Sequence, residues 1–556
     1  NGTVVTITAT FNEVMKDSPV PQIQITGNAT LAPAAMTKTS TTVYTYPYTV
    51  NGTNGLATVS LLIGEDLIGN VVIPTPTSGG SFYVDNAAPD NQNIVLASSV
   101  TVKGGAAVSI VSSGDASNTV WLAPSGKTLP GEFTAGATMT NASGTATSIN
   151  APANAGTYYI YVIDAAGNVS AASTADVTVD TTAPTNQNTV LADSISVKGG
   201  TTVTIVSSGD ASNTVWLAPA GTTVFTAGTN MTKAAGDATS IIAPAAEGTY
   251  HIYVIDAVGN VSAASTAGVT VDNTAPTNQN DVLTSSANVK GGTEIVISSS
   301  GDASNSVWLA PAGTTSFTNT GTTMTTAGGT ATSINAPTNE NDYKLYVIDG
   351  VGNVSSASTN IARVDNTAPN NENTVLKASV TAMGGTQVTI TPSAASDTIW
   401  LAPLGTSSFA SNTSTITVAS GTAASITAPL NKGDYRIYLI DAAGNLSDAS
   451  DATVTVDNSR PTNQNVVLSQ SVTVKGGVDV EIVTSFSGST IWLATYSATV
   501  FVEDFLNMTK ATPPATSIKS PTNEGDYKLF VINAVGNYSE PSIATVTVDN
   551  TPPTSQ

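Results

Sequence analysis

Hydrophobic and polar positions alternate in short runs along most of this chain. Between residues 182 and 273 the runs are "NTVLA", "TVTIVSS", "NTVWLA", "ATSI", "TYHIYVID" and "GVTVD", and Gly, Asn, Asp and Pro punctuate them. Alternation with a period of two over four to eight residues is typical of strands that bury one face. About seven such strands in about 92 residues predict a Greek-key β-sandwich.

The same pattern returns along the chain with an almost constant period. All five Trp residues stand in "VWLA" or "IWLA" phrases, at Trp121, Trp216, Trp308, Trp400 and Trp492, with spacings of 95, 92, 92 and 92 residues. Residues 1–86 lack Trp but keep the ending "YVDNAAPDNQN". Their opening "NGTVVTITATFNE" aligns with "GGTTVTIVSSGD" from Gly199, so we predict a divergent domain whose first strand is missing.

This period predicts six domains and a short remainder. The predicted domains are 1–86, 87–181, 182–273, 274–366, 367–458 and 459–550, and residues 551–556 begin a further linker. Both ends of the sequence fall where a longer array would be cut, so we expect a fragment of a larger protein.

Composition narrows the class of protein. There is no Cys, so each domain depends on its own core. Lys and Arg total 17 against 39 acidic residues, and the net charge of −22 argues against a nucleic-acid surface. Most of the acids are Asp, the acid of turns and of calcium loops. No apolar run approaches 18 residues, so no transmembrane segment is expected.

Two aromatic positions make the sandwich prediction more specific. Trp stands in the third strand of each repeat, and a Gly-x-Tyr step such as Gly248/Tyr250 opens the sixth. These are the positions of the strand-C Trp and of the tyrosine corner in immunoglobulin-like domains. An aromatic core in another kind of β-sandwich is the alternative. We therefore predict an all-β fold of tandem immunoglobulin-like Greek-key sandwiches arranged as an elongated rod.

The joints carry a phrase of the form "DAxGN…VDxTAPxxxx", and it recurs over nearly the whole chain. The phrase resembles the bacterial immunoglobulin-like (Big-type) repeats of large cell-surface adhesins and some S-layer proteins. The resemblance implies an extracellular location on a bacterial cell surface, and it implies calcium sites at the domain junctions.

The residues support such sites on their own. In tandem immunoglobulin-like domains, the end of strand G meets the B–C and F–G loops of the next domain. Here an Asp closes strand G, another follows strand F, and a third lies in the B–C loop. The predicted metal sets are Asp85, Asp115 and Asp164 at the first joint, Asp180, Asp210 and Asp256 at the second, and Asp272, Asp302 and Asp349 at the third. The fourth keeps Asp365 and Asp441 but has Ala394 in the B–C loop, and Asp66 with Glu13 forms half of a further joint.

Calcium suits these joints better than other metals. It takes six to eight oxygens, which two or three Asp side chains, backbone carbonyls and the side chains of Asn186, Asn188 or Asn260 can supply. Without a cation the clustered carboxylates would repel one another. The alternative is that each Asp only closes a turn, because "DAxGN" is by itself a good hairpin turn.

The fifth joint departs from the pattern. Asp457 faces Asn533, and the B–C loop "SFSGST" has no acid. The acids are lost together, as expected of a shared ligand set. We predict metal at the first four joints and weak or absent binding at the fifth.

Nothing in the sequence predicts catalysis. The single His, His251, stands where sister repeats have Tyr159, Lys344, Arg436 and Lys528, so it marks an interchangeable solvent-facing position. We expect a non-enzymatic, calcium-stiffened surface protein: an adhesin stalk, or an S-layer or surface-filament subunit. Its partners would be its own neighbouring domains across bridged joints, further copies in a lattice or filament, and a host surface or glycan. Two alternatives stay open: an array that binds carbohydrate or another ligand, and an accessory region of a secreted enzyme.

Overall fold

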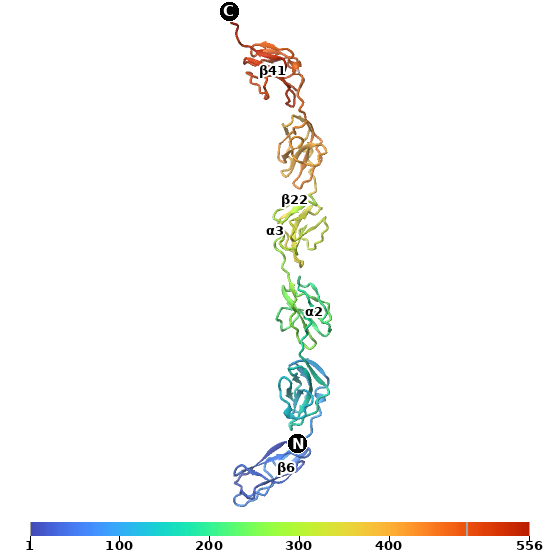
Figure 1. The fold of residues 1–556 in the computed structure, drawn as a ribbon, viewed down its shortest axis with the longest axis vertical. Helices are drawn as coiled ribbons and strands as arrows, with labels where there is room; N and C mark the ends of the chain where they lie inside the picture. Colours follow the sequence, from blue (N-terminus) through green and yellow to red (C-terminus); the bar gives the residue numbers. More distant parts are fainter. Residues whose placement is uncertain (1, 485–486, 555–556) are drawn as a thin grey trace. The chain divides into compact units, whose positions relative to one another are not determined.

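The structure of the protein is a computed structural model that describes residues 2–484 and 487–554. The chain divides into two compact units, Asn1–Asn273 and Thr274–Gln556. The fold is all-β, as predicted, and is built from tandem immunoglobulin-like sandwiches (Figure 1). The boundaries of the domains and their arrangement as a rod stay predictions.

Each of the five repeats consists of one helical turn followed by seven strands, which we letter A′, B, C, C′, E, F and G. The helical turns are α1 (Gln92–Val95), α2 (Gln187–Val190), α3 (Gln279–Val282), α4 (Glu372–Val375) and α5 (Gln464–Val467). The A′ strands are β8 (Val100–Lys103), β15 (Ile195–Val197), β22 (Ala287–Val289), β29 (Val380–Ala382) and β36 (Val472–Val474). The B strands are β9 (Ala107–Ser109), β16 (Thr202–Thr204), β23 (Glu294–Val296), β30 (Gln387–Thr389) and β37 (Asp479–Glu481).

The remaining strands follow in the same order. The C strands are β10 (Thr119–Ala123), β17 (Thr214–Ala218), β24 (Ser306–Pro311), β31 (Thr398–Pro403) and β38 (Thr490–Ala494). The C′ strands are β11 (Thr140–Ser143), β18 (Thr232–Ala235), β25 (Thr325–Gly328), β32 (Thr417–Ser420) and β39 (Thr509–Ala511), and a 3-10 turn, η1 (Pro130–Glu132), precedes β11. The E strands are β12 (Ser148–Asn150), β19 (Ser240–Ile242), β26 (Ser333–Asn335), β33 (Ser425–Thr427) and β40 (Ser517–Lys519). The F strands are β13 (Gly156–Ile163), β20 (Gly248–Ile255), β27 (Asn341–Ile348), β34 (Gly433–Ile440) and β41 (Gly525–Ile532). The G strands are β14 (Asp176–Asp180), β21 (Gly268–Val271), β28 (Ile361–Val364), β35 (Thr453–Val456) and β42 (Thr545–Val548).

Two sheets enclose the core of each repeat. Strands A′, G, F, C and C′ form a five-stranded sheet in that order, and B and E form the second. A′ pairs with G in parallel, as in β15 with β21, and the other pairs are antiparallel. Alternate residues of C and F, such as Val215, Leu217, Ile252 and Val254, face the second sheet and are fully buried.

The run "NTVLA" was expected to be a strand, and this prediction is wrong. The chain makes one helical turn there, α2, and only then becomes extended. In a strand, Val190 and Leu191 would face opposite sides. The helical turn lets both side chains enter the core, where they are 1% and 5% exposed. Burial of both side chains therefore favours a helical turn over the strand that the alternating pattern predicts.

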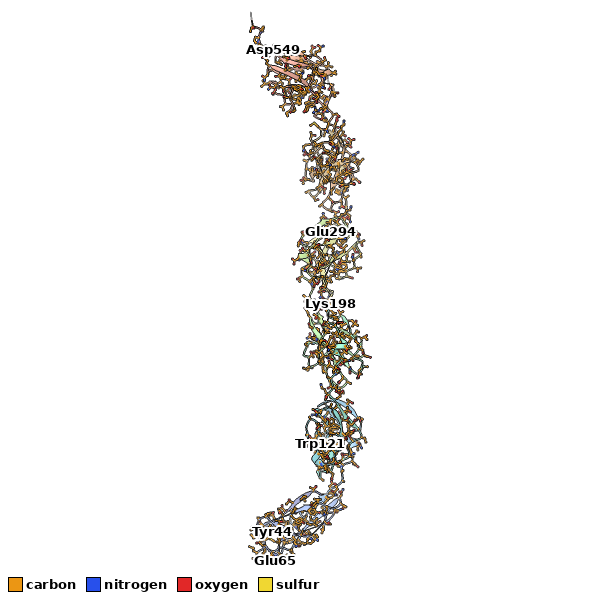
Figure 2. The ribbon with its side chains drawn as sticks, viewed as in Figure 1. Tyr44, Glu65, Trp121, Lys198, Glu294 and Asp549 are labelled. Carbon is orange, nitrogen blue, oxygen red and sulfur yellow. The ribbon has the colours of Figure 1, made fainter. Side chains whose placement is uncertain are left out.

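The comparison with the immunoglobulin strand-C Trp is also wrong. Val215 and Leu217 face the core, so the side chain of Trp216 between them points to the outer face of the five-stranded sheet. There Phe225, from the loop between C and C′, packs against Trp216 and Tyr253 with ring-centroid distances of 5.6 and 5.1 Å. Trp121, labelled in Figure 2, has the same arrangement with Phe133. The Trp residues therefore build a second, smaller apolar cluster.

The tyrosine corner is confirmed in every repeat. The Tyr250 hydroxyl donates a 2.8 Å hydrogen bond to the carbonyl of Ala246, four residues earlier. The equivalent donors are Tyr158, Tyr343, Tyr435 and Tyr527, with distances of 2.8 to 3.0 Å. This bond ties the E–F connection to strand F.

The segment 1–86 is a smaller sandwich of seven strands. They are β1 (Val4–Thr10), β2 (Gln22–Gly27), β3 (Leu31–Ala35), β4 (Thr37–Lys38), β5 (Val43–Thr49), β6 (Gly55–Leu62) and β7 (Ser81–Val84). Their sheets have the orders β1-β5-β4 and β3-β2-β6-β7. By sequence alignment β1 corresponds to strand B, and among residues 2–86 no helical turn or A′ strand precedes it.

Candidate functional site

The candidate site is the joint between consecutive sandwiches, and its F–G loop is a closed turn. In the second joint, Oδ1 of Asp256 accepts hydrogen bonds from the backbone N–H groups of Val258 and Asn260, at 3.0 and 2.8 Å. Gly259 adopts φ 93°, a conformation that favours Gly. Asp66, Asp164, Asp349 and Asp441 close the same turn. The turn-closing role proposed as the alternative is therefore real for these acids.

One side chain connects this turn to the preceding sandwich. The amide Nδ2 of Asn260 donates to Oδ2 of Asp256 at 2.9 Å and to the backbone carbonyl of Asp180 at 3.0 Å. The corresponding bonds across other joints are Asn168 to Asp85 at 3.1 Å, Asn445 to Asp365 at 2.7 Å and Asn537 to Asp457 at 2.6 Å. We call this contact the Asn clamp. Asn260 was predicted only as an oxygen donor to a metal, although the Asn that follows Asp by four residues in each "DxxGN" is a visible signal.

The Asp that ends strand G is held by its own linker. Oδ1 of Asp85, Asp180, Asp365 and Asp457 accepts the N–H of the residue two positions on, at 2.8 to 3.0 Å. The Asn clamp thus brings this Asp and the F–G Asp to the same amide nitrogen. At the first, second and fourth joints the amide thus connects the F–G carboxylate with the backbone of the strand-G Asp.

The third predicted ligand lies in a turn of its own. Oδ1 of Asp210 accepts both the hydroxyl and the N–H of Ser212, at 2.7 and 2.9 Å, and Asp115 and Asp302 do the same with Ser117 and Ser304. The hydrogen bonds from the hydroxyl and N–H of Ser212 lower the pKa of the Asp210 carboxyl below its usual value. Over residues 2–484 and 487–554, no three acidic or His side chains gather closely enough to hold a metal. The calcium prediction stays a prediction.

Two predicted positions need separate mention. Asp272 belongs to the first compact unit, and Asp302 and Asp349 belong to the second, so their pairing at the third joint stays a prediction. In the fifth repeat, Ser485 and Phe486 of the predicted acid-free B–C loop lie outside the described residues.

The start of each helical turn supplies oxygens that lack partners. Nδ2 of Asn186 donates to the carbonyl of Ser208 at 2.7 Å, and this contact leaves Oδ1 of Asn186 buried without a hydrogen bond. Oε1 of the neighbouring Gln187 is also buried and unpaired. Asn91 and Gln92 at the start of α1, and Asn278 and Gln279 at the start of α3, repeat this pair. A cation or an ordered water would satisfy such oxygens, and amide oxygens are among the ligands that calcium takes.

The fourth joint has an acid among these oxygens. Glu372 replaces the Gln, is 6% exposed, and keeps Oε2 without a partner. Oδ1 of Asn445 in the clamp is also unpaired. A buried carboxylate is costly unless a positive charge or hydrogen bonds compensate it. Glu372 is therefore a ligand candidate that the sequence analysis missed.

At the fifth joint, Asn533 stands in place of the F–G Asp, and the linker carries a positively charged side chain, Arg460. Nδ2 of Asn533 donates to the carbonyl of Ser459 at 3.2 Å, a bond that an Asp could not make. Arg460 from the linker forms a salt bridge with Glu540, and its guanidinium lies 5.2 Å from the ring centroid of Tyr538. Oε1 of Gln464 is unpaired here too, so an orphaned Gln oxygen is not by itself a sign of metal. This joint is linked by side chains of both signs.

The N-terminal sandwich carries the same turn at Asp66. Burial raises the pKa of Asp66, but hydrogen bonds from Asn70, Ile68 and Gly69 outweigh it and leave the pKa below its usual value. Nδ2 of Asn70 donates to Oδ2 of Asp66 at 2.7 Å. Asp66 is therefore held as an ionised turn acid, and the further joint predicted for it with Glu13 stays a prediction.

His251 has a structural contact. Its Nδ1 pairs with the carbonyl of Ser265 at 2.8 Å, and the ring is half-buried. The sister residues Lys344 and Lys528 also donate to carbonyls of the following loop. The position is interchangeable, as expected, and is less exposed than predicted. No helix in the described part of the chain is both long and apolar enough to cross a membrane.

Comparison with known proteins gives likenesses of fold. No protein-family model matches the sequence, and no curated protein matches it. SGBP-B of the Bacteroides ovatus mixed-linkage glucan utilization locus, in complex with a mixed-linkage heptasaccharide, is 17% identical over 47% of this chain, with a TM-score of 0.13. The chain spans 65% of the length of that protein.

Two further similar structures are arrays of several domains. The FN1–FN3 domains of chicken CNTN1 are 11% identical over 47% of this chain and 96% of theirs, with a TM-score of 0.20. The N-terminal eight Ig domains of Down Syndrome Cell Adhesion Molecule isoform 1.30.30 are 12% identical over 99% of this chain and 83% of theirs, with a TM-score of 0.14. These identities and scores are too low to indicate a function.

Proposed function

We propose that this chain is a non-enzymatic structural part of a bacterial cell-surface protein, in which tandem immunoglobulin-like sandwiches act as an extracellular spacer. The observation that carries this proposal is the Asn clamp, because the same side chain crosses four joints in the same way. A repeated joint of this kind would hold neighbouring domains together. The spacer would be an adhesin stalk, or the body of an S-layer or surface-filament subunit.

We propose further that calcium binds at the first four joints. At the second joint the carboxylates of Asp180 and Asp256 and the unpaired oxygens of Asn186 and Gln187 would hold the ion. Bound calcium would neutralise the local negative charge and restrict bending of the linker. The fifth joint, with Arg460 in the linker, would not need it. Support comes from the donor chemistry and the orphaned oxygens.

Calcium titration of the full chain by calorimetry tests this proposal. We expect saturable binding at four joints, and the double variant Asp180→Asn with Asp256→Asn should lose one site. The matched control is Asp457→Asn at the fifth joint, which should leave the stoichiometry unchanged. Absence of binding at millimolar calcium, or an equal loss in the control, contradicts the calcium proposal.

The spacer proposal has its own measurement. Small-angle scattering of the full chain should give a maximum dimension that falls on adding chelator, because unliganded linkers bend more freely. A compact particle with and without calcium would rule out the spacer. The carbohydrate-binding alternative gains no support from the Trp residues, because the Phe of each C–C′ loop packs over them.

A further inference from the structure

The C–C′ loop of the fifth repeat, residues 495–508, exposes far more apolar surface than its counterparts. Its large apolar side chains that are 53% to 72% exposed are Tyr496, Val500, Val502, Phe505 and Leu506. The corresponding loops of the other four repeats carry at most one such side chain each, namely Leu129, Val224 and Leu404. Apolar side chains that gather on one exposed segment mark interaction sites, whereas single ones are ordinary.

The tip of this loop is a closed turn that is fixed to the body of its repeat. Oδ1 of Asp504 accepts the N–H groups of Asn507 and Met508, at 2.8 and 2.7 Å. The carbonyl of Phe505 accepts the N–H of Thr522, in the E–F connection, at 3.0 Å. The turn is therefore formed in advance, and it presents Phe505 with 58% of that residue exposed.

The third and fourth repeats make the same turn with small residues at its tip. Gly321, Thr413 and Phe505 occupy the same position, with φ of 70°, 58° and 56°. Each accepts an N–H from its own E–F connection at 3.0 Å. Positive φ favours Gly and strains a bulky residue. Phe505 thus costs folding energy at a position where it gains little burial, and strain of this kind is typical of functional residues.

A following sandwich does not cover this position. In the fourth repeat Thr413 is exposed, although the fifth sandwich follows directly and is joined to the fourth by the Asn clamp of Asn537. The exposure of Phe505 is therefore a property of the turn within its repeat.

The charge of the loop indicates the surface that it fits. Residues 495–508 contain Glu503 and Asp504 and no Lys or Arg. Hydrogen bonds from Asn507 and Met508 lower the pKa of the Asp504 carboxyl below its usual value, so it stays ionised. Two carboxylates beside an apolar tip complement a pocket with a cationic rim. They oppose an anionic lipid surface, and they oppose a second copy of this chain, whose net charge is −22.

We propose that the turn 503–507 is a docking element, which inserts Phe505 and Leu506 into an apolar pocket of a partner protein whose rim carries Lys or Arg. Aromatic anchors that enter pockets supply much of the binding energy at protein interfaces. A turn that is formed in advance also lowers the entropy cost of binding. The fifth repeat then makes a contact of its own, which goes beyond the role of a spacer.

A peptide with the chemistry of such a pocket tests the proposal. The probe is a fluorescent amphipathic helix built only of Leu and Lys, with all Leu on one face, and the control peptide has Glu in place of Lys. Fluorescence anisotropy with the full chain, at a salt concentration of about 0.15 M to screen distant charges, should show saturable binding of the probe alone.

Variants of the full chain locate the contact. Phe505→Gly should lower the affinity by about tenfold or more. Glu503→Gln should weaken binding less and reduce its dependence on salt, because Glu503 does not close the turn. The matched control is Leu404→Ser, which removes a 71% exposed apolar side chain from the fourth repeat and should leave the affinity unchanged.

Transfer of the tip to the fourth repeat gives a second, independent measurement. The variant with Ser411→Glu, Asn412→Asp, Thr413→Phe and Ser414→Leu should bind one more probe molecule per chain, because the two repeats share the turn. Hydrogen exchange over residues 487–550 separates binding from folding. It should be no faster in Phe505→Gly, because Gly relieves the strained backbone.

Four results overturn the proposal. One is that the probe does not bind, or that the Glu peptide binds equally well. Another is that Phe505→Gly binds as well as Leu404→Ser, or that its fifth repeat exchanges at least about fivefold faster, which would make Phe505 a packing residue. A third is binding of the chain to vesicles of phosphatidylglycerol and phosphatidylcholine that Phe505→Gly abolishes, which would make a membrane the target. The last is a dimer in sedimentation that Phe505→Gly dissociates, which would make a second copy the partner.

Discussion

The side-chain amide of Asn260 reaches 80 positions back along the chain and donates a 3.0 Å hydrogen bond to the backbone carbonyl of Asp180. Asn260 is 4% exposed and is oriented by the carboxylate of Asp256, to which it also donates. The carboxylate of Asp256 orients the side-chain amide of Asn260, and that amide binds the end of the previous sandwich. A turn acid therefore contributes to the joint through its neighbour.

Asn260→Ala should loosen the second joint. The lost bond across the joint is worth about 1 kcal/mol net, which corresponds to about a fivefold shift toward the open linker. Cleavage of the linker around residues 181–187 by a non-specific protease should rise by that factor. The control is Asn70→Ala, which removes the same bond to a turn acid in the N-terminal sandwich. It should leave the cleavage rate at residues 181–187 unchanged.

The joints should respond differently to chelator. We expect linker cleavage at the first four joints to rise on removal of calcium, while cleavage near Arg460 stays constant. Added salt should raise cleavage near Arg460 more than cleavage at the first four joints. The reason is that salt screens the exposed Arg460–Glu540 pair, which contributes at most about 1 kcal/mol. Mass spectrometry of the fragments identifies which linker is cut. Equal sensitivity of all joints to chelator would show that the acids do not distinguish them.

Phe133→Ala should destabilise its own repeat. Phe133 is 8% exposed and packs between Trp121 and Tyr161, at 5.5 and 5.2 Å. We expect a loss of about 3 kcal/mol, because the substitution leaves a gap under the C–C′ loop. Hydrogen exchange resolved by peptide should show the loss in residues 87–181 alone. Phe133→Leu, which keeps an apolar side chain, should cost about half as much.

The tyrosine corners should make stability fall at high pH. Burial raises the pKa of the Tyr250 hydroxyl above its usual value of about 10, and the same holds for its four equivalents. The pKa of these hydroxyls is therefore higher in the folded state than in the unfolded state. The stability that they contribute is fully present below a pH of about 10, and it is lost as the pH rises toward the pKa of the folded state.

Phe substitutions isolate this effect. Each Tyr→Phe change removes one hydroxyl bond and should cost about 1 kcal/mol at pH 8. The variant with all five changes, at Tyr158, Tyr250, Tyr343, Tyr435 and Tyr527, should lose less further stability between pH 9 and pH 11 than the original chain. Urea unfolding followed by circular dichroism measures both quantities. An equal loss in the two proteins would assign the alkaline effect to other groups.

The strands could be predicted because period-two alternation and turn residues mark them locally. The tyrosine corner followed from one spacing, Gly-x-Tyr, and its hydrogen bond is also local. The helical turn at Gln187–Val190 could not be predicted, because it depends on a core that accepts two consecutive side chains. Only the tertiary environment supplies that information.

The error about the placement of the Trp side chains has a physical origin. Trp216 faces away from the main core because Val215 and Leu217 occupy it, and a period of two cannot say which of two apolar faces is inside. At the joints, the F–G loop contacts the end of the preceding strand G, but the sequence does not show how each carboxylate is used. Asp210 bonds within its loop to Ser212, a local alternative that competes with any shared ligand set.

The parallel pairing of β15 with β21 has a mechanical consequence. The chain enters a repeat beside the start of one of these strands and leaves it from the end of the other. Traction on the two linkers therefore pulls the strands in opposite directions along their length. The hydrogen bonds between them are loaded in shear and must break together, whereas bonds loaded in peeling break one after another. Each repeat is built to resist being stretched by its ends.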